Sequence, residues 1–339
     1  MSAYVEGKNR VWRLRSRPVG QPKKTDLELC VEDIPTITDG QMLVKNKYLS
    51  IDPTHRIWMS DRPQYMPPVG IGEIMRAGGI GEVIESKVDG FKAGMNVWGF
   101  TGMSDYCVGI PGVTIMGEAG PRVAPLPLQA ELSVASLIVG LAAWHGMVKV
   151  IEPKADEIIV VSGAAGAVGS LAGQLAKVRG AKVVGIAGGP AKCAYLKECG
   201  FDLAIDYKSE SVDAALKKFA PDGINGYFDN VGGETTDAVL LNFANNGRAA
   251  ICGSISEYDD KWSGWKNTNM ILMRRVMVKG FICSDHTDEM PDMTAEVVKL
   301  VQEGKLKYKE DIQEGLENYI DVVQMLQTGK NEGKLMIKI

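Results

Sequence analysis

The second half of the chain opens with a pattern that predicts a strand, a helix and a second strand. Ile158–Val161 and Lys182–Ala187 are short, mainly apolar runs, as strands buried on both faces require. Between them, apolar residues recur at spacings of three and four, as on one face of a helix: Val168, Leu171, Leu175 and Val178. This order is typical of the beginning of a parallel α/β sheet with right-handed crossovers.

The same alternation continues to about Ile282. Further strands are predicted at Leu203–Tyr207, Gly226–Val231, Arg248–Cys252 and Val276–Ile282. Helices are predicted at Ser211–Phe219 and Glu234–Phe243. Strands that alternate with helices along the chain predict a doubly wound parallel sheet.

The first part of the chain has a different pattern. The span from Leu27 to Gly112 is rich in glycine and proline, with short alternating runs such as Gln41–Tyr48 and Gly79–Glu85, which predicts a mainly β domain. The last segment has a predicted helix at Leu316–Gln327 and a strand at Lys334–Ile339, whose alternation suits a return to the first sheet. The expected fold class is α/β, with a β domain and a doubly wound parallel-sheet domain.

A glycine-rich turn lies between the first predicted strand and its helix. Gly163, Gly166 and Gly169 follow at spacings of three. Gly166 lets the backbone approach a pyrophosphate, and Gly169 lets the helix pack closely on the strand. Free N–H groups at the helix N-terminus favour phosphate binding. Because Ala164 replaces the first glycine of G-x-G-x-x-G, an ordinary βα turn is the alternative, but the flanking strands and helix favour dinucleotide binding.

The end of the second strand bears on which dinucleotide binds. An NAD site usually has Asp or Glu there, bound to the ribose 2′-OH. Here the strand ends in Gly188 and Gly189, with no acid, and Lys192 follows. A cation without a carboxylate suits a 2′-phosphate, which favours NADP(H). Lys192 is equally consistent with a solvated helix-surface lysine, and sequence position alone leaves both interpretations open.

Composition and charge narrow the classes of protein. The chain has 339 residues, 45% hydrophobic and 24% charged, which is ordinary for a globular enzyme of two domains. Its net charge of −4, with mixed signs, gives no nucleic-acid or membrane-surface signature. No apolar run approaches the roughly 20 residues that span a bilayer. The first stretch, MSAYVEGKNRVWRLRSR, has no signal-peptide core, so a cytoplasmic location is expected.

Cysteine and histidine positions argue against a metal centre. The six cysteines lack paired spacing, which favours free thiols in a reducing compartment over a zinc cluster. His55, His145 and His286 each lack a second ligand at suitable spacing. We therefore expect packing or hydrogen-bonding roles for the histidines, and no metal site.

Stretches across almost the whole chain resemble one family. They are YLSIDPTHR, PPVGIGEIMRAGGIGEVIESK, SGAAGAVGSLAGQLAK, FDNVGG, CGSISEY, NMILMRRVMVKGFICSD and GKLKYKEDIQEGLENY…GKNEGK. The chain resembles the zinc-independent medium-chain dehydrogenase/reductases, and among them the NADPH-dependent alkenal/one reductases of the prostaglandin reductase, plant double-bond reductase and curcumin reductase types. The resemblance implies a GroES-like substrate domain (1–127), an NADP-binding Rossmann domain (128–304), a return segment (305–339) and a homodimer.

The resemblance also implies which residues contact NADP(H). The implied contacts run from the pyrophosphate through the 2′-phosphate to the nicotinamide half. They are Ala165, Gly166, Ala167, Val168 and Gly169; then Gly188, Lys192 and Tyr207; then Asn230, Cys252, Gly253, Ser254, Phe281, Ile282, Cys283 and Asn331.

Conjugate reduction of an α,β-unsaturated aldehyde or ketone is the activity that the resemblance implies. Zinc alcohol dehydrogenases polarise a carbonyl with a metal held by Cys and His, and the first domain, with Cys30, Cys107 and one His, has no such arrangement. Conjugate reduction needs only hydrogen-bond donors for the enolate oxygen. The family suggests Tyr258 and the ribose 2′-OH for this role, with Tyr258 also helping to deliver the proton.

Substrate preference is open at the sequence level. Tyr65 is a candidate for lining the substrate pocket, or else a core or rim aromatic. The family's D-P-Y-M-R run has Thr54 and His55 here in place of Tyr and Met, so this chain's preference can differ. Two alternatives remain: a quinone reductase on the same fold, and an NADPH-binding sensor with little catalysis.

Overall fold

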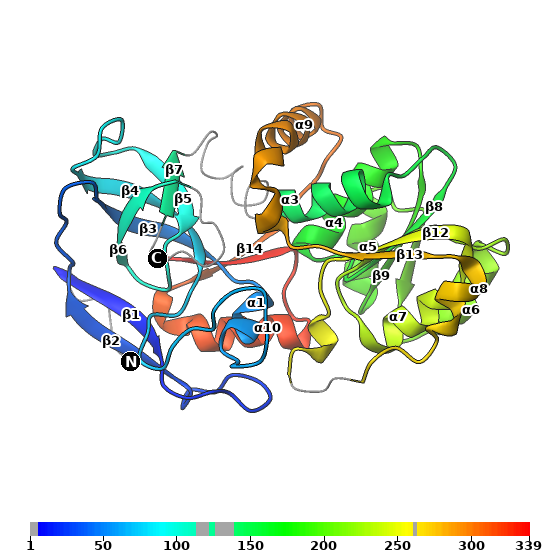
Figure 1. The fold of residues 1–339 in the computed structure, drawn as a ribbon, viewed down its shortest axis with the longest axis horizontal. Helices are drawn as coiled ribbons and strands as arrows, with labels where there is room; N and C mark the ends of the chain where they lie inside the picture. Colours follow the sequence, from blue (N-terminus) through cyan, green and yellow to red (C-terminus); the bar gives the residue numbers. More distant parts are fainter. Residues whose placement is uncertain (1–5, 113–121, 126–138, 260–262) are drawn as a thin grey trace. The chain divides into compact units, whose positions relative to one another are not determined.

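The computed structural model describes residues 6–112, 122–125, 139–259 and 263–339 (Figure 1). The chain divides into two compact units. We call Met1–Ile138 with Glu310–Ile339 the barrel unit, and Val139–Lys309 the parallel-sheet unit. In the part of the chain that is described, no helix is both long and apolar enough to span a membrane.

Six parallel strands form the centre of the parallel-sheet unit, in the order β10-β9-β8-β11-β12-β13. They are β8 (Ile158–Ser162), β9 (Lys182–Ala187), β10 (Leu203–Asp206), β11 (Ile224–Asp229), β12 (Phe243–Ile251) and β13 (Met277–Gly280). The first strand of this unit, β8, lies in the middle of the sheet. The chain then adds β9 and β10 on one side of β8, and β11, β12 and β13 on the other. This confirms the predicted doubly wound sheet.

Helices cover both faces of this sheet because its strands are apolar on both sides. Ile159 and Val161 belong to one apolar cluster, and Val160 to the other. The first cluster includes residues of α3 (Val139–Trp144), η2 (His145–Ile151), α4 (Ala167–Val178), α5 (Pro190–Glu198) and α9 (Met290–Gln302). The second includes residues of α6 (Val212–Phe219), α7 (Gly233–Leu240) and α8 (Asn269–Arg274).

A seven-stranded sheet, in the order β14-β15-β3-β4-β5-β7-β6, forms the described part of the barrel unit. Its members are β3 (Met42–Ser50), β4 (Gly78–Ser86), β5 (Asn96–Phe100), β6 (Tyr106–Pro111), β7 (Arg122–Pro125), β14 (Glu310–Glu314) and β15 (Lys334–Lys338). A further pairing between β3 and β6 closes five of these strands into a barrel. A separate hairpin pairs β1 (Lys8–Leu14) with β2 (Leu27–Asp33).

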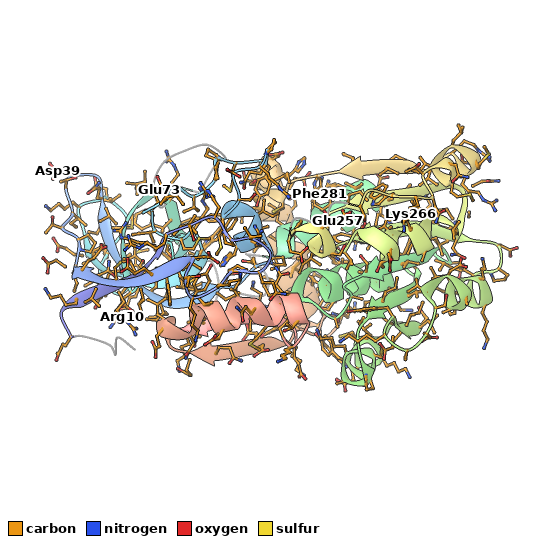
Figure 2. All side chains as sticks on the ribbon, turned by 90° about the horizontal axis from the view of Figure 1, so that it is seen from below. Arg10, Asp39, Glu73, Glu257, Lys266 and Phe281 are labelled. Atoms are coloured by element: carbon orange, nitrogen blue, oxygen red, sulfur yellow. The ribbon has the colours of Figure 1, made fainter. Side chains whose placement is uncertain are left out.

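The C-terminal segment returns to the barrel unit, as its alternating pattern predicts. β15 pairs antiparallel with β3, with Met336 opposite Ser50. Arg10, labelled in Figure 2, makes a two-pronged ion pair with Asp105 at 2.9 and 3.0 Å and a third bond to Glu317 at 2.8 Å. Arg10 therefore ties the first strand of the chain to the segment that returns last.

Several predicted boundaries are wrong. The strand predicted at Arg248–Cys252 is β12, which begins at Phe243, and the strand predicted at Val276–Ile282 is β13, which ends at Gly280. Two further errors have a clear local reason. The predicted strand Gly226–Val231 ends at Asp229, because the Asp229 carboxylate accepts the N–H groups of Val231 and Gly232 at 2.9 and 3.0 Å and turns the chain. The predicted helix Glu234–Phe243 ends at Leu240, and Phe243 instead begins β12, opposite Ile224 of β11.

Candidate active site

The order in which the chain adds strands to the sheet reverses between β8 and β11. Chains leave these two strands toward opposite edges, so their carboxyl ends bound the crevice where ligands bind in doubly wound folds. Asn230, directly after β11, donates its side-chain N–H to the Ser162 carbonyl at 2.7 Å, and its backbone N–H to Ser162 Oγ at 2.9 Å. Asn230 is thus fixed at this crevice, on the end of β8.

Asp229 organises this end of the sheet. Its carboxylate is completely buried and accepts Ser162 Oγ–H and Tyr227 O–H, both at 2.8 Å, together with Thr236 Oγ1–H. A buried carboxylate is tolerated when several donors meet it. The Asp229 network holds the loops after β8 and β11 in one arrangement.

The glycine-rich turn has the geometry expected of a phosphate-binding turn. Gly163 has φ of +56°, a left-handed conformation that favours glycine. A Cβ on Gly169 would lie 2.4 Å from the Gly163 carbonyl oxygen, so only glycine allows α4 to sit this close to β8. α4 begins at Ala167, and no described side chain caps it. Its first-turn N–H groups therefore point at the crevice with the helix dipole behind them.

Gly188 and Tyr207 come together at the ends of β9 and β10. A Cβ on Gly188 would lie 2.9 Å from the Tyr207 ring, and Lys192 lies in the first turn of α5. Asp206 is the last residue of β10. Its carboxylate accepts the Gly189 N–H at 2.8 Å, which lowers the pKa of Asp206, and also the Lys208 N–H at 3.1 Å. Asp206 is therefore engaged in shaping the turn.

The loop after β12 folds over the end of β11. The N–H groups of Cys252 and Gly253 both donate to the Asp229 carbonyl, at 2.8 and 3.1 Å, and the Ile255 N–H donates to the Asn230 carbonyl at 3.2 Å. Glu257, labelled in Figure 2, is buried and accepts the N–H of Ser263 at 3.3 Å. Both sides of the loop that carries Tyr258 are therefore anchored.

Tyr258 turns its hydroxyl back onto this loop. The Ser254 N–H donates to the Tyr258 hydroxyl oxygen at 3.1 Å, and the same oxygen would lie 2.8 Å from a Cβ on Gly253. Burial raises the pKa of the Tyr258 hydroxyl to about 12, against the opposing effect of the Ser254 hydrogen bond. The hydroxyl therefore keeps its proton at physiological pH and can donate it.

Phe281, Ile282 and Cys283 follow β13 at the same edge of the sheet. The Phe281 N–H donates to the Ile251 carbonyl at 3.4 Å, and its buried ring packs against Phe228 at 6.3 Å between centroids. The predicted contacts of the parallel-sheet unit thus all lie on loops or helix starts at the carboxyl ends of its strands.

Tyr65 and Asn331 belong to the barrel unit. The Tyr65 hydroxyl accepts the indole N–H of Trp58 at 2.8 Å, and the ring is half-buried in a shallow surface pocket formed by residues 61–68. Asn331 is buried, and its side-chain N–H donates to the Gly333 carbonyl at 3.1 Å. Asn331 therefore already shapes the turn before β15.

His55 is a core residue of the barrel unit. It lies on α1 (Thr54–Trp58), is completely buried, and its Nδ1 is 3.0 Å from the Tyr319 hydroxyl of α10 (Tyr319–Thr328). Burial lowers the pKa of His55 to about 4, despite the opposing charge of Asp52. The imidazole at this position therefore packs as a neutral group.

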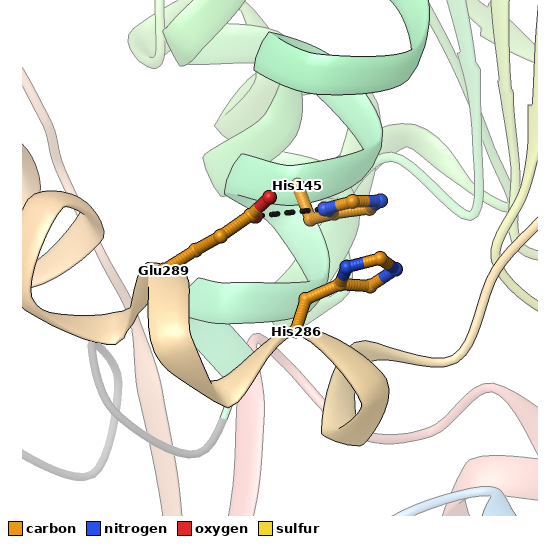
Figure 3. A group of neighbouring side chains, drawn as sticks. All are labelled: His145, His286 and Glu289. Carbon is orange, nitrogen blue, oxygen red and sulfur yellow. Dashed lines mark hydrogen bonds and ion pairs between the residues drawn. The ribbon is translucent and has the colours of Figure 1, made fainter.

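Sequence reasoning missed two groups of residues. Ser162 and Asp229 gave no signal beyond their position at strand ends. The fold also brings His145, His286 and Glu289 together, with one candidate ligand atom from each lying within 4.8 Å of the others (Figure 3). The expectation that His145 and His286 lack a second ligand rested on spacing along the sequence, and the fold brings the two histidines and Glu289 together from separate segments. The three-residue spacing of His286 and Glu289 was the available signal.

Comparisons with known proteins cover nearly the whole chain. Residues 10–115 match the family described as the N-terminal domain of oxidoreductase, and residues 167–302 match the zinc-binding dehydrogenase family. The NADPH-dependent curcumin reductase of Escherichia coli is 35% identical, over 98% of this chain and 97% of the relative. The NADP(+)-dependent 2-alkenal reductase of Nicotiana tabacum is 36% identical, over 96% of each. The crystal structure of CurA from Vibrio vulnificus in complex with NADPH superimposes with a TM-score of 0.88, at 35% identity, covering 97% and 98% of the chains.

Proposed function

Because this chain belongs to the NADPH-dependent alkenal/one reductase family of the medium-chain dehydrogenase/reductases, we propose that it uses NADPH to saturate the C=C bond of α,β-unsaturated aldehydes and ketones. The observation that carries the proposal is the half-buried Tyr258, whose hydroxyl oxygen is held by the Ser254 N–H at 3.1 Å on the loop after β12, at the carboxyl edge of the sheet. The relatives named for curcumin and 2-alkenals reduce compounds of this chemical class.

NADPH binding is proposed along the carboxyl edge of the parallel sheet. Ala165–Gly169 offer backbone N–H groups to the pyrophosphate. Tyr207, beside Gly188, and Lys192, in the first turn of α5, hold the 2′-phosphate, since the Asp206 carboxylate already accepts two backbone N–H groups. Asn230 lies at the crevice itself.

The nicotinamide half is assigned to the loops after β12 and β13. These contribute Cys252, Gly253, Ser254, Phe281, Ile282 and Cys283. Asn331 is proposed to reach the cofactor from the C-terminal segment. The strand-end position of each loop supports this assignment, because ligands of such sheets bind outside the carboxyl ends.

Tyr258 is the proposed catalytic residue. When bound, NADPH supplies the hydride, which adds to the β-carbon of the substrate, and the nicotinamide ribose 2′-OH supplies a second hydrogen-bond donor. Tyr258 donates its O–H to the substrate oxygen, where negative charge develops as the C=C electrons shift, and so stabilises the enolate. Protonation of the α-carbon, assisted by Tyr258, completes the saturated carbonyl product.

We also propose three further properties on the basis of the family. We propose a homodimer, a cytoplasmic location, and a division of the chain into 1–127, 128–304 and 305–339. Tyr65 is the proposed substrate contact of the first of these segments. The proposed substrate is a small unsaturated carbonyl compound.

The test is a substrate panel with NADPH: a medium-chain 2-alkenal, an enone, a quinone and the saturated aldehyde matched to the alkenal. We expect turnover of the alkenal and the enone, recovery of the saturated carbonyl, and no turnover of the saturated aldehyde. Activity confined to the quinone would assign a quinone reductase instead. Tight NADPH binding without any turnover would leave the sensor as the function.

A further inference from the structure

Two imidazole rings and a carboxylate meet on the parallel-sheet unit. His145 Nδ1 lies 2.8 Å from Glu289 Oε2, and the His145 and His286 rings stack with centroids 3.6 Å apart and planes 18° from parallel (Figure 3). One ligand atom from each residue falls within 4.8 Å of the other two. None of the three has a part in the proposed reduction.

Local structure explains why the three side chains converge. His286 and Glu289 lie on η4 (Cys283–Glu289), a 3₁₀ segment that is kinked at His286. His145 starts η2 directly opposite them (Figure 3). His286 itself departs from helical geometry, with φ of −124° and ψ of 33°, which turns its ring toward His145.

The site is partly shielded from solvent: His145 is buried, and His286 and Glu289 are half-buried. His145 is only 2% exposed, and the Phe281 ring lies 5.2 Å from its ring. Within the described residues, His145 Nε2 is buried without a hydrogen-bond partner.

We propose that His145, His286 and Glu289 bind one zinc-class divalent ion. Two imidazole nitrogens and one carboxylate oxygen form an N₂O set that suits Zn²⁺, with water as the fourth ligand. Zn²⁺ imposes no geometry through its d-electrons, so it accepts a set assembled from two loosely aligned rings.

Binding requires two small movements. Ligand bonds of roughly 2.0–2.1 Å place tetrahedral ligand atoms about 3.3 Å apart. The His145–Glu289 pair must therefore open by about 0.5 Å, while the proton shared between them leaves to solvent as the ion takes its place. The His286 ring must also rotate out of the stack. The nitrogen lone pairs of two stacked rings lie in parallel planes, so they cannot both point at one ion. Its ring is only partly buried, which leaves room for this rotation.

Such an ion would link η4 to η2, because its ligands come from both segments. η4 begins at Cys283, the last residue of the segment assigned to the nicotinamide, so the ion would stiffen the chain that leads out of the cofactor site. The proposal does not depend on the reductase activity and adds to it a separate site.

The experiment measures binding of Co²⁺ and of Zn²⁺ to the full chain after chelator treatment. We expect one Co²⁺ per chain with micromolar affinity, visible d–d bands of a tetrahedral N/O site without thiolate charge-transfer bands, and displacement by Zn²⁺. Zn²⁺ should raise Tm, because an ion that binds only the folded state stabilises it. Affinity should fall as pH is lowered, since protons compete for the ligands.

Two variants and one control decide the assignment. His286→Ala and Glu289→Gln should each weaken Co²⁺ binding by at least about tenfold. Glu289→Gln keeps a hydrogen-bond acceptor for His145, so loss of binding there reports ligation rather than misfolding. Asp288→Asn, on an exposed neighbouring carboxylate, should bind as the parent does. Binding that is unchanged in both ligand variants, thiolate bands, or no saturable binding at micromolar Co²⁺ would overturn the proposal.

Discussion

The hydroxyl oxygen of Tyr258 accepts the backbone N–H of Ser254 at 3.1 Å. This bond occupies a lone pair of the oxygen and leaves the hydroxyl hydrogen to donate elsewhere. It also fixes the hydroxyl relative to Gly253, whose lack of a side chain permits the approach. A donor held in position before the reaction costs no reorganisation when charge develops, which is the basis of oxyanion stabilisation.

Replacing Tyr258 by Phe should lower kcat for a 2-alkenal by about a hundredfold, because one oxyanion donor is removed. KM for NADPH should change little, since the ring and the backbone bonds of the loop remain. Steady-state kinetics with both substrates varied would measure this. Tyr106→Phe, on a half-buried tyrosine of the barrel unit, is the matched control. A kcat equal to the parent's would remove Tyr258 from the mechanism.

The pH profile gives a second test of Tyr258. Its pKa is raised to about 12, and a phenol donates only below its pKa, so activity carried by this proton is lost only as pH rises toward that value. Between pH 7 and 10, kcat should show no decline from this ionisation. A fall in kcat with a midpoint between pH 8 and 9 that disappears in Tyr258→Phe would show an exposed, ordinary hydroxyl instead.

Lys192 should set the choice between NADPH and NADH. A charge-assisted bond to the 2′-phosphate is worth roughly 1.5–3 kcal/mol. Lys192→Ala should therefore raise KM for NADPH by about ten- to a hundredfold and leave KM for NADH nearly unchanged. Lys197→Ala, on an exposed lysine of the same helix, is the control. Equal losses with both cofactors would point to a structural role for Lys192.

His55 should make the folded state sensitive to mild acid. The unfolded histidine titrates near pH 6.5, whereas burial lowers the pKa of His55 to about 4 in the folded chain. As pH falls below about 6.5, the imidazole is protonated in the unfolded chain but not in the folded one. The free energy of unfolding is therefore unaffected above about pH 6.5 and declines as pH falls toward 4. The loss attributable to His55 is about 2 kcal/mol at pH 5.

Urea unfolding at pH 7 and pH 5 measures this effect. His55→Met removes the titrating group, so its free energy of unfolding should decline by about 2 kcal/mol less than the parent's between the two pH values. The variant also leaves the Tyr319 hydroxyl without its partner, which shifts both values equally. Parallel declines in parent and variant would show that His55 is accessible to protons in the fold.

Sequence patterns predicted most of the fold because burial on both faces leaves an unambiguous signature. Ile158–Val161 and Lys182–Ala187 are apolar throughout most of their length, and each is a strand in the structure. The strand boundary at Asp229 was missed because the Asp229 carboxylate accepts the N–H groups of the two turn residues after it. The helix boundary at Leu240 was missed because Phe243, predicted as helical, belongs to strand β12. Side-chain hydrogen bonds to the backbone and pairing with a later strand are not visible in the hydrophobic periodicity of a sequence.

The candidate site was predictable where its residues follow strands, and not where the fold alone brings them together. Gly166, Asn230 and Tyr258 could be named as candidates from the sequence because a motif or the resemblance marks them. His145 and His286, which lie 141 positions apart in the printed sequence, are neighbours only because η2 and η4 pack on the same face of the sheet. The role of His55 likewise became clear only when the structure placed it against Tyr319.

Where the hydride arrives tests the central claim most directly. The protein would be given a 2-alkenal and NADPH carrying deuterium at both C4 positions of the reduced nicotinamide, and the product would be examined by NMR. We expect the saturated aldehyde with deuterium on C3, a proton from water on C2, and no deuterium on C1. An allylic alcohol with deuterium on C1 would show direct carbonyl reduction and contradict the proposed function.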